Sequence, residues 1–302
     1  MKRNGFSRHN KQRWQCLQCR TTYGWTNQEN TRHRTGIWFE RWVIEGYGLR
    51  QLSFQSGRSI RTMQRIISRS LERSPAEIQP TNTDHILFDG TFIYRRMVGV
   101  MVVMDGNRHE LIAGAYGLKE SYHDLARFFG DIRAQGCHPR SATVDGNTGA
   151  ILALKSVWPT ITIQRCLVHI QRQGLMWCRQ QPKRTDAKKL RALFLVVANI
   201  HTTEERDHFL RQLASWEERY GGRIASSQET GWVFSDLKRA RSMLIKALPH
   251  MFHYLNDPAI PWNTNGLEGY FSRLKSRYRQ HRGLAQYHRK EYFNWYFYLC
   301  RR

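Results

Sequence analysis

The stretch from His85 to Tyr116 reads HILFDGTFIYRRMVGVMVVMDGNRHELIAGAY, and it decides the fold. It contains three apolar, β-like runs, at His85–Phe88, Met97–Met104 and Glu110–Tyr116. The middle run is continuously apolar from Val98 to Val103, which predicts a strand that is buried on both faces. Asp105-Gly106-Asn107, between the second and third runs, has the composition of a hairpin turn. The stretch therefore predicts three meandering strands.

Helices and strands alternate after this meander. The predicted elements are a helix, a strand, a helix and a strand, at Tyr122–Gln135, Ser141–Val144, Thr148–Val157 and Thr160–Arg165. A meander of three strands followed by this alternation is the order of a ribonuclease H-like α/β core with a mixed sheet. In that order Asp89 ends the first strand and Asp145 ends the fourth. We expect these two strands to be neighbours at the centre of the sheet.

Three acidic residues stand in three separate settings. Asp89 lies in ILFDGTF, Asp145 in SATVDGNTG, and Glu268 opens a basic amphipathic helix in NTNGLEGYFSRLK. Taken singly, an Asp-Gly is more often a turn than a metal ligand. Carboxylates that converge from separate elements repel one another unless a cation neutralises them, and their hard oxygens favour Mg²⁺ or Mn²⁺. The pattern predicts a two-metal site, with ions roughly 3.5–4 Å apart, for phosphoryl transfer.

A Cys-x-x-His motif, Cys166-Leu167-Val168-His169, lies between the second Asp and the Glu. The Asp-Gly-Thr, Asp-Gly, Cys-x-x-His and Asn-x-x-Glu elements occur in the order found in the DDE transposases of the mutator superfamily. From about Trp14 to its C-terminus the chain resembles the bacterial insertion-sequence members of that superfamily. Cys166 is interpreted as a buried thiol. His169 either hydrogen-bonds near the scissile phosphate or orients a carboxylate.

The resemblance implies a transposase that binds the terminal inverted repeats of an insertion sequence and catalyses metal-dependent strand cleavage and strand transfer. Asp89, Asp145 and Glu268 would be its catalytic triad and its Mg²⁺ or Mn²⁺ ligands, with Glu291 the next candidate should Glu268 fail. Its partners would be double-stranded DNA, as transposon ends and target, and further copies of itself in a synaptic complex. One alternative is a domesticated or inactive transposase-derived DNA-binding regulator, and another is a ribonuclease H-like nuclease without strand transfer.

Composition agrees with a nucleic-acid partner. The 302 residues contain 48 Lys and Arg against 24 Asp and Glu, which gives a net charge of +24 and a pI near 10.3. Such an excess predicts a polyanionic partner. The six cysteines form no disulfide pattern, no signal peptide is recognisable, and the run Met97–Met104 is too short for a membrane span. We expect a bacterial cytoplasmic, nucleoid-associated protein without membrane contact.

Residues 1–35 are interpreted as a partial zinc-ribbon-like basic arm. Cys16 and Cys19 form one Cys-x-x-Cys, whereas a tetrahedral zinc site needs four ligands. In the family this segment resembles the second half of a ribbon whose first Cys pair would lie before Met1. His9 or His33 are candidates to complete a site, so Zn²⁺ stays open as a second cofactor.

Residues 36–74 are predicted to be a helix-turn-helix. Ile37, Trp38, Trp42 and Val43 recur at helical spacing, and Ser59 is the predicted N-cap of a second helix after the turn Gln55–Arg58. The apolar stripe of that helix is Ile60, Met63, Ile67 and Leu71. The predicted DNA-binding residues are Arg58, Arg61, Gln64, Arg65 and Arg69. The alternative is a helical hairpin with a solvated basic face.

The rest of the chain divides into three further parts. Residues 84–170 are predicted to form the first part of the catalytic core and residues 261–302 its last part, with the Glu268 helix. Residues 171–260 read as an all-α insertion, which the resemblance also implies. Arg273, Lys275 and Arg277 follow Glu268 in a strongly basic run and are predicted to contact DNA phosphates.

Overall fold

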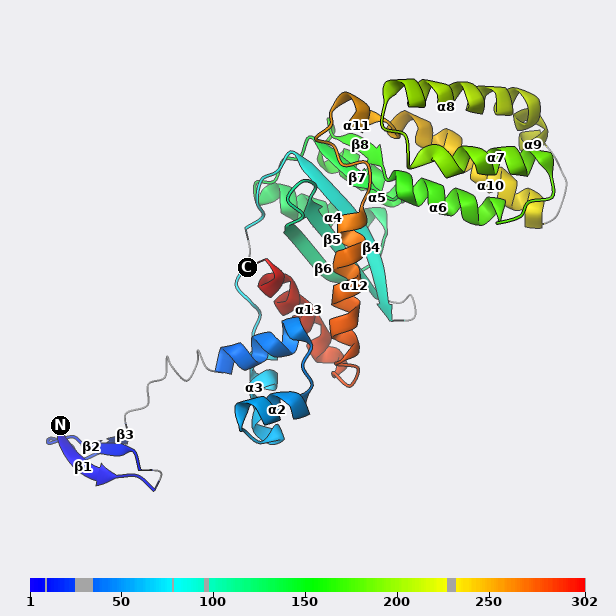
Figure 1. Cartoon of the computed structure of the whole chain (residues 1–302). Helices are drawn as coiled ribbons and strands as arrows, with labels where there is room; N and C mark the ends of the chain where they lie inside the picture. The colour runs from blue at the N-terminus through cyan, green and yellow to red at the C-terminus, as the bar shows by residue number, and fades with distance from the viewer. Residues whose placement is uncertain (9, 25–34, 78, 95–97, 227–231, 302) are drawn as a thin grey trace. The chain divides into compact units, whose positions relative to one another are not determined.

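The central stretch folds, in the computed structural model, into three antiparallel strands of a five-stranded mixed sheet (Figure 1). The strand order is β6-β5-β4-β7-β8. The five strands are β4 (His85–Tyr94), β5 (Val98–Asp105), β6 (Leu111–Leu118), β7 (Ser141–Val144) and β8 (Thr162–Arg165). β7 runs parallel to both β4 and β8. The predicted meander, the α/β class and the neighbouring positions of the first and fourth strands of this sheet are confirmed.

The structure describes residues 1–8, 10–24, 35–77, 79–94, 98–226 and 232–301. The chain divides into two compact units, Met1–Arg73 and Ser74–Arg302, and the sheet belongs to the second.

β4 is longer than the sequence analysis predicted. The run ILFDGTF was expected to end a strand at Asp89, but β4 continues to Tyr94 and pairs with β5 along that length. β7 stops at Val144, which pairs with Phe88. The Asp-Gly therefore marks the end of the β4–β7 pairing, while the β-branched and aromatic residues that follow continue the hairpin with β5.

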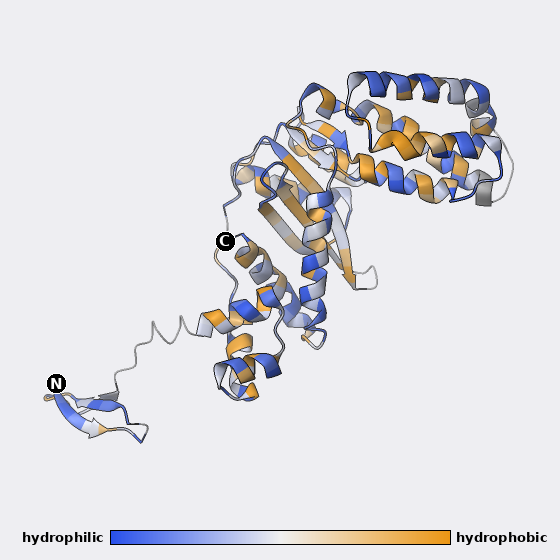
Figure 2. Cartoon of the chain, in the orientation of Figure 1, coloured by the Kyte–Doolittle hydropathy of each residue, from blue (hydrophilic) through white to orange (hydrophobic). Residues whose placement is uncertain are grey.

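Helices cover both faces of the sheet. On one face α4 (Tyr122–Ala134) and α5 (Thr148–Val157) pack on the strands, and Phe129 contacts Phe88 edge to face. On the other face α12 (Asn265–Arg279) packs on β4 and α13 (Gln286–Cys300) on β6, where Tyr116 and Phe293 stack 4.4 Å apart. A Cβ at Gly114 would collide with the Phe297 ring, so the close approach of α13 requires glycine there. Strand residues that are coloured hydrophobic in Figure 2, such as Val100 to Val103 of β5, are buried beneath these helices.

Between β8 and α12 every described element is helical (Figure 1). These elements are α6 (Leu167–Cys178), α7 (Thr185–Val197), α8 (Thr203–Trp216), η2 (Glu217–Gly221), α9 (Gly222–Ser226), α10 (Trp232–Ala247), η3 (Leu248–His250) and α11 (His253–Asn256). They enclose a core of their own, in which the Phe194 ring of α7 packs directly on Gly174 of α6, where a Cβ would collide with it. None of the described helices is long and apolar enough to cross a membrane.

The first unit contains a small sheet and a helical part. The sheet is antiparallel and consists of β1 (Lys2–Phe6), β2 (Gln12–Gln15) and β3 (Thr22–Gly24). The helical part has an α-helical segment at residues 35–40, the π-helical turn η1 (Arg41–Glu45), α2 (Leu49–Ser56) and α3 (Ile60–Leu71).

Local sequence explains how α2 and α3 are joined. Gly57 ends α2 with a left-handed φ of 66°, and the Ser59 hydroxyl accepts a hydrogen bond from the Thr62 N–H at 3.2 Å, as predicted for an N-cap. Met63 is buried as predicted, but Ile60 is 41% exposed because it is the first residue of α3. The predicted stripe of the first helix is also corrected, because Ile37 is exposed and Phe39 is buried with Trp42.

Candidate active site

Sheet register brings Asp89 and Asp145 together. Phe88 on β4 pairs with Val144 on β7, and each aspartate is the next residue along its parallel strand. Asp145 directly follows the end of β7, whereas Asp89 lies inside β4 opposite Val102 of β5. Because β4 and β7 are adjacent and parallel, the two carboxylates leave the sheet at one edge.

The surroundings of Asp89 disfavour its charge. Burial, and then the neighbouring Asp145 carboxylate, raise the pKa of Asp89 to about 7, although the nearby His169 acts in the opposite direction. The Gly90 N–H also donates to Asp89 Oδ1 at 2.8 Å. Two carboxylates in this setting repel each other, and a bound cation would relieve that repulsion.

Asp145 is held by the loop that follows it. Its Oδ1 accepts a hydrogen bond from the Asn147 N–H at 2.9 Å, and its backbone carbonyl accepts one from Arg165 Nη2 at 3.0 Å. Gly146 has a φ of 106°, and a Cβ there would collide with the Arg165 guanidinium. The loop thus needs glycine at 146, both for its backbone conformation and for the close approach of this arginine.

Cys166 and His169 lie at the start of α6, next to the two aspartates. Cys166 is fully buried and is the N-cap residue of α6, as the interpretation of a buried thiol required. Its hydrogen bond with His169 raises the pKa of His169 to about 9, with the charges of Asp89 and Asp145 adding to the effect. Burial alone would raise the pKa of Cys166, but hydrogen bonds with His169 and Thr264 outweigh it and lower that pKa. This site therefore favours an imidazolium beside the carboxylates.

Thr264 joins this cluster to the Glu268 helix. Its hydroxyl donates to Cys166 Sγ at 3.4 Å and lies 3.3 Å from His169 Nδ1. Thr264 is also the N-cap residue of α12, and its carbonyl accepts a hydrogen bond from the Glu268 N–H at 3.3 Å. The first turn of α12 is thereby fixed against the start of α6.

Glu268 forms an ion pair with an arginine of the same chain. Its carboxylate pairs with the Arg172 guanidinium, which lies one turn after His169 on α6. Both side chains remain accessible, with 34% of Glu268 and 59% of Arg172 exposed. Within the described ranges no three His, Cys, Asp or Glu side chains lie close enough together to hold a metal ion. The structure thus brings Asp89 and Asp145 together and leaves Glu268 engaged by Arg172.

A further acid, Glu120, was missed by the sequence analysis. Its Oε2 accepts a hydrogen bond from Asn147 Nδ2 at 3.1 Å, and burial together with Asp145 raises its pKa. In the sequence Glu120 stands directly before Ser121, so it resembles an ordinary residue ahead of a helix. Glu291, the named substitute for Glu268, instead contacts Ser74 and Asn294.

Cys16 and Cys19 lie on the turn between β2 and β3. The Cys16 N–H donates to the Thr21 carbonyl at 3.0 Å, which closes the turn. Hydrogen bonds with the side chain and backbone of Thr21 lower the pKa of Cys19 to about 7. His9 and His33, the candidates to complete a zinc site, lie outside the described residues.

The predicted DNA-binding residues are accessible on two helices. On α3 the exposed side chains are Arg61, Gln64, Arg65 and Arg69, while Arg58 in the preceding turn is half-buried. On α12 Arg273 and Arg277 are exposed and Lys275 is half-buried. Each helix thus presents a basic face to solvent.

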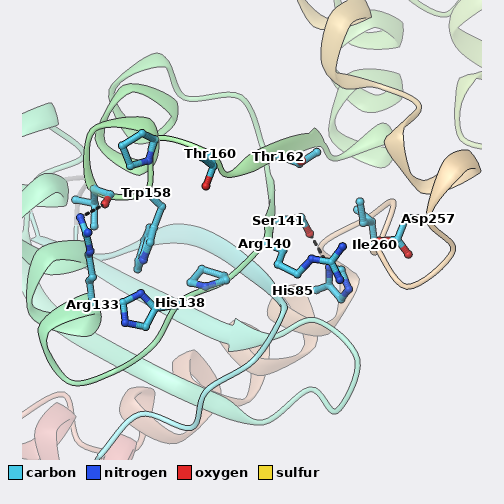
Figure 3. A pocket seen from close by; sticks show the side chains of 13 residues that line it. His85, Arg133, His138, Arg140, Ser141, Trp158, Thr160, Thr162, Asp257 and Ile260 are labelled. Carbon is cyan, nitrogen blue, oxygen red and sulfur yellow. Dashed lines mark hydrogen bonds between the residues drawn. The ribbon is translucent and has the colours of Figure 1, made fainter.

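A separate cavity of about 460 Å³ lies at the opposite end of the strands (Figure 3). His85, Ser141 and Thr162, the first residues of β4, β7 and β8, line it, and the His85 ring hydrogen-bonds to the Ser141 hydroxyl at 2.8 Å. None of the predicted site residues borders it. The cavity is therefore not the place where the aspartates meet.

Comparison with known proteins gives one family and two curated relatives. Residues 55–247 match the model of the family described as Transposase, Mutator family, a range that includes both aspartates and Glu120 but not Glu268. The transposase for insertion sequence element ISRM3 of Rhizobium meliloti (strain 1021) is 28% identical over 140 residues, which cover 45% of the chain and 33% of the relative. A probable transposase for an ISRM3-like element of Sinorhizobium fredii is 25% identical over 136 residues, which cover 45% and 32%. The match thus spans about a third of the length of each relative.

Proposed function

The chain belongs to the Mutator family of transposases, and from this premise we propose that it binds the terminal inverted repeats of an insertion sequence and catalyses metal-dependent DNA strand cleavage and strand transfer. The observation that carries the proposal is the register of β4 and β7, which sets Asp89 and Asp145 side by side within the family match. Both relatives are named as transposases of insertion sequence elements, which supports the proposal.

Mg²⁺ or Mn²⁺ fits the residues present. Asp89, Asp145 and Glu268 would hold it, because all three offer hard carboxylate oxygens and the buried Asp89 lies beside a second negative charge. When bound, such ions supply charge neutralisation for the attacking and leaving oxygens of phosphoryl transfer. To hold an ion, Glu268 would have to leave its ion pair with Arg172, and the exposed Arg172 guanidinium would then be able to contact a DNA phosphate.

The surrounding residues have supporting roles in this proposal. His169 keeps a positive charge beside the aspartates and orients them, and its ring is fixed by Cys166 and Thr264. Arg165 fixes the backbone of Asp145. Arg273, Lys275 and Arg277 follow Glu268 on α12 and contact phosphates beside the scissile bond.

The parts of the chain have distinct functions in the same proposal. The sheet with its helices is a ribonuclease H-like catalytic core, made of residues 84–170 and 261–302, and residues 171–260 form its all-α insertion. Residues 36–74 form a helix-turn-helix that binds the element's ends, with residues 1–35 as a ribbon-like arm. Two or more copies assemble on the paired ends, because both ends must be cut and joined together.

A cleavage assay on the element's own ends tests the proposal. The full chain should cut and join duplexes that carry the terminal repeat in Mg²⁺ or Mn²⁺. It should fail in Ca²⁺, because calcium binds oxygen ligands in a longer and looser geometry. Strand cleavage that persists in chelator would contradict the metal requirement.

A transposase-derived DNA-binding regulator is the second candidate. The ion pair of Glu268 with Arg172, and the absence of a three-ligand cluster within the described part of the chain, favour it. The same assay separates the two functions, because a regulator would bind the repeats specifically and cut them in none of these metals.

Zinc content tests the ribbon-like arm. If the Cys16 and Cys19 thiols bind zinc, the purified protein should contain about one Zn²⁺ per chain, as a tetrahedral structural site requires. The double change Cys16→Ser and Cys19→Ser should remove it, while Cys300→Ser, which alters another exposed cysteine, should not. If metal analysis finds no zinc in the purified wild-type protein, Cys16 and Cys19 do not form a zinc site.

A further inference from the structure

The turn that joins α12 to α13 carries positive charge only. Between Glu268 and Glu291 the sequence contains seven Lys and Arg and no acid. The acids at the two ends are engaged elsewhere, Glu268 with Arg172 and Glu291 with Ser74 and Asn294. The cations between them therefore have no acid of their own segment to pair with. The exposed cations of the turn, which we call the hairpin tip (residues 277–290), are Arg277, Arg279, Arg282 and Lys290.

One aromatic ring of the hairpin tip lies outside the core. Tyr287, in the first turn of α13, is 78% exposed, and its ring centroid lies 4.2 Å from that of His288 at an angle of 48°. The aromatic residues that α13 buries come later in the helix and are Tyr292, Phe293, Tyr296 and Phe297. Packing of α13 thus uses these later residues, and the Tyr287 ring is presented to solvent.

Hydrogen bonds and a ring contact stabilise the fold of the hairpin tip. The His281 N–H donates to the Tyr278 carbonyl at 2.9 Å, and the Leu284 N–H donates to the His281 carbonyl at 2.9 Å. His281 is 6% exposed, and its ring packs edge to face on Tyr292. Because the turn is anchored in this way, a ligand that stacks on Tyr287 would cost little entropy for ordering the chain.

The start of α13 favours an anion beside this ring. Ala285 is the N-cap residue of α13 and offers no side-chain acceptor, and the first turn contains no acid. N–H groups at the N-terminus of a helix attract phosphate oxygens, and here no side chain caps them. An exposed aromatic ring and a phosphate-binding helix start therefore occur within one helical turn, on a tip that also carries exposed cations.

We propose that the hairpin tip binds a DNA strand at an unpaired base, with that base stacked on Tyr287 and the neighbouring phosphates on the tip cations. Cations alone attract any duplex, whereas an exposed ring adds a contact that only an unpaired base can make, because paired bases are covered by their neighbours in the stack. Unpaired bases occur where a duplex opens beside a cut. The inference rests on the proposed function for its DNA partner, and it assigns the tip to opened strand ends.

Photochemical cross-linking of the full chain tests the stacking directly. The probe is a duplex of random sequence with a short single-stranded tail that carries 5-iodouracil, a base that reacts on irradiation with an aromatic side chain stacked on it. Mass spectrometry should locate the cross-link at Tyr287. The same base placed inside a fully paired duplex should give no cross-link there, because its faces are covered. Cross-links from the tail that form only at other residues would overturn the inference.

Affinities for the tailed duplex and for a blunt duplex of the same sequence give a second readout. Tyr287→Ala should weaken binding to the tailed duplex roughly tenfold, because it removes one base–aromatic stack, and should change binding to the blunt duplex little. Tyr287→Phe keeps the ring and should bind both duplexes as the wild type does. Gln286→Ala is the matched control, because Gln286 is the exposed neighbour of Tyr287 in the same helical turn and has no ring.

The outcomes separate this inference from the proposed function. Equal losses on the two duplexes in Tyr287→Ala overturn base stacking, and they leave cleavage and joining to their own assay. A lower melting temperature of Tyr287→Ala, with no loss of preference for the tailed duplex, makes Tyr287 a structural residue and also overturns the inference. A chain that cross-links through Tyr287 but cuts DNA in no metal keeps the hairpin tip as a binding surface and overturns only the proposed catalysis.

Discussion

Asp89→Asn and Asp145→Asn are each expected to abolish strand cleavage and joining while leaving DNA binding near the wild-type level. Asparagine keeps the size of the side chain but removes an anionic oxygen ligand, so a divalent ion is no longer held between β4 and β7. Glu268→Gln should have the same effect on chemistry, because the carboxylate that exchanges Arg172 for the ion is gone.

The measurement is cleavage and joining of pre-formed repeat ends in Mg²⁺, with binding followed separately by mobility shift. Asp131→Asn is the control, because it makes the same chemical change on an exposed face of α4 and should leave both readouts unchanged. Normal cleavage by Glu268→Gln would exclude Glu268 as the third carboxylate.

Asp89→Asn should also stabilise the metal-free protein. The folded-state pKa of Asp89 is about 7, above the ordinary value of 3.8, so the folded state binds this proton more tightly than the unfolded state does. Stability from this group is therefore lost as the pH rises through that interval, and at neutral pH the shift of about three pKa units destabilises the folded state by roughly 4 kcal/mol. In chelator at neutral pH the variant should melt at a higher temperature than the wild type, and the difference should shrink as the pH falls towards the ordinary pKa of 3.8.

Strand pairing at the site was predictable because it depends on local patterns. The hairpin turn at Asp105–Asn107, the apolar run from Val98 to Val103 and the helix Thr148–Val157 are all set by residues near in sequence. Their order then places the strands of Asp89 and Asp145 next to each other. The predicted end of the first strand at Asp89 was wrong, because the pattern Asp-Gly-Thr fits both a turn and a strand that changes its pairing partner.

Contacts across long sequence separations were not predictable in the same way. Glu120 contacts Asn147 from a loop 27 residues earlier, and Arg172 reaches Glu268 across 96 residues. Neither pair has a spacing that one helix or one strand could explain, and an acid before a helix N-cap is common in any sequence. Only the folded sheet edge brings these side chains together.

Neighbouring apolar residues on the short helix α2 differ in burial. Leu52 of α2 is fully buried, but Phe54, two residues later, is 89% exposed. A helix of eight residues has only one inward face, so residues two apart point to different sides.

The largest effect on binding is expected at α3. A fragment of residues 1–74 carries 15 Lys and Arg against 4 acids, so its affinity for DNA should fall steeply with salt. Arg61 and Arg65 are exposed on α3, the second helix of the proposed helix-turn-helix. Changing both to Ala should weaken binding to the terminal repeat by about 1–3 kcal/mol for each arginine that reads a base.

Comparison of two duplexes at several salt concentrations decides between base recognition and simple charge attraction. A base-reading arginine adds affinity only on its own sequence, so the double variant should lose more on the terminal repeat than on random duplex. Arg50→Ala is the control, because Arg50 is exposed on α2 and should change binding to both duplexes by the same small factor. Equal losses on the two duplexes would mean that Arg61 and Arg65 contact phosphates only. A fragment that fails to bind either duplex at low salt would remove the helix-turn-helix from the proposal, and end recognition would then have to come from the basic face of α12.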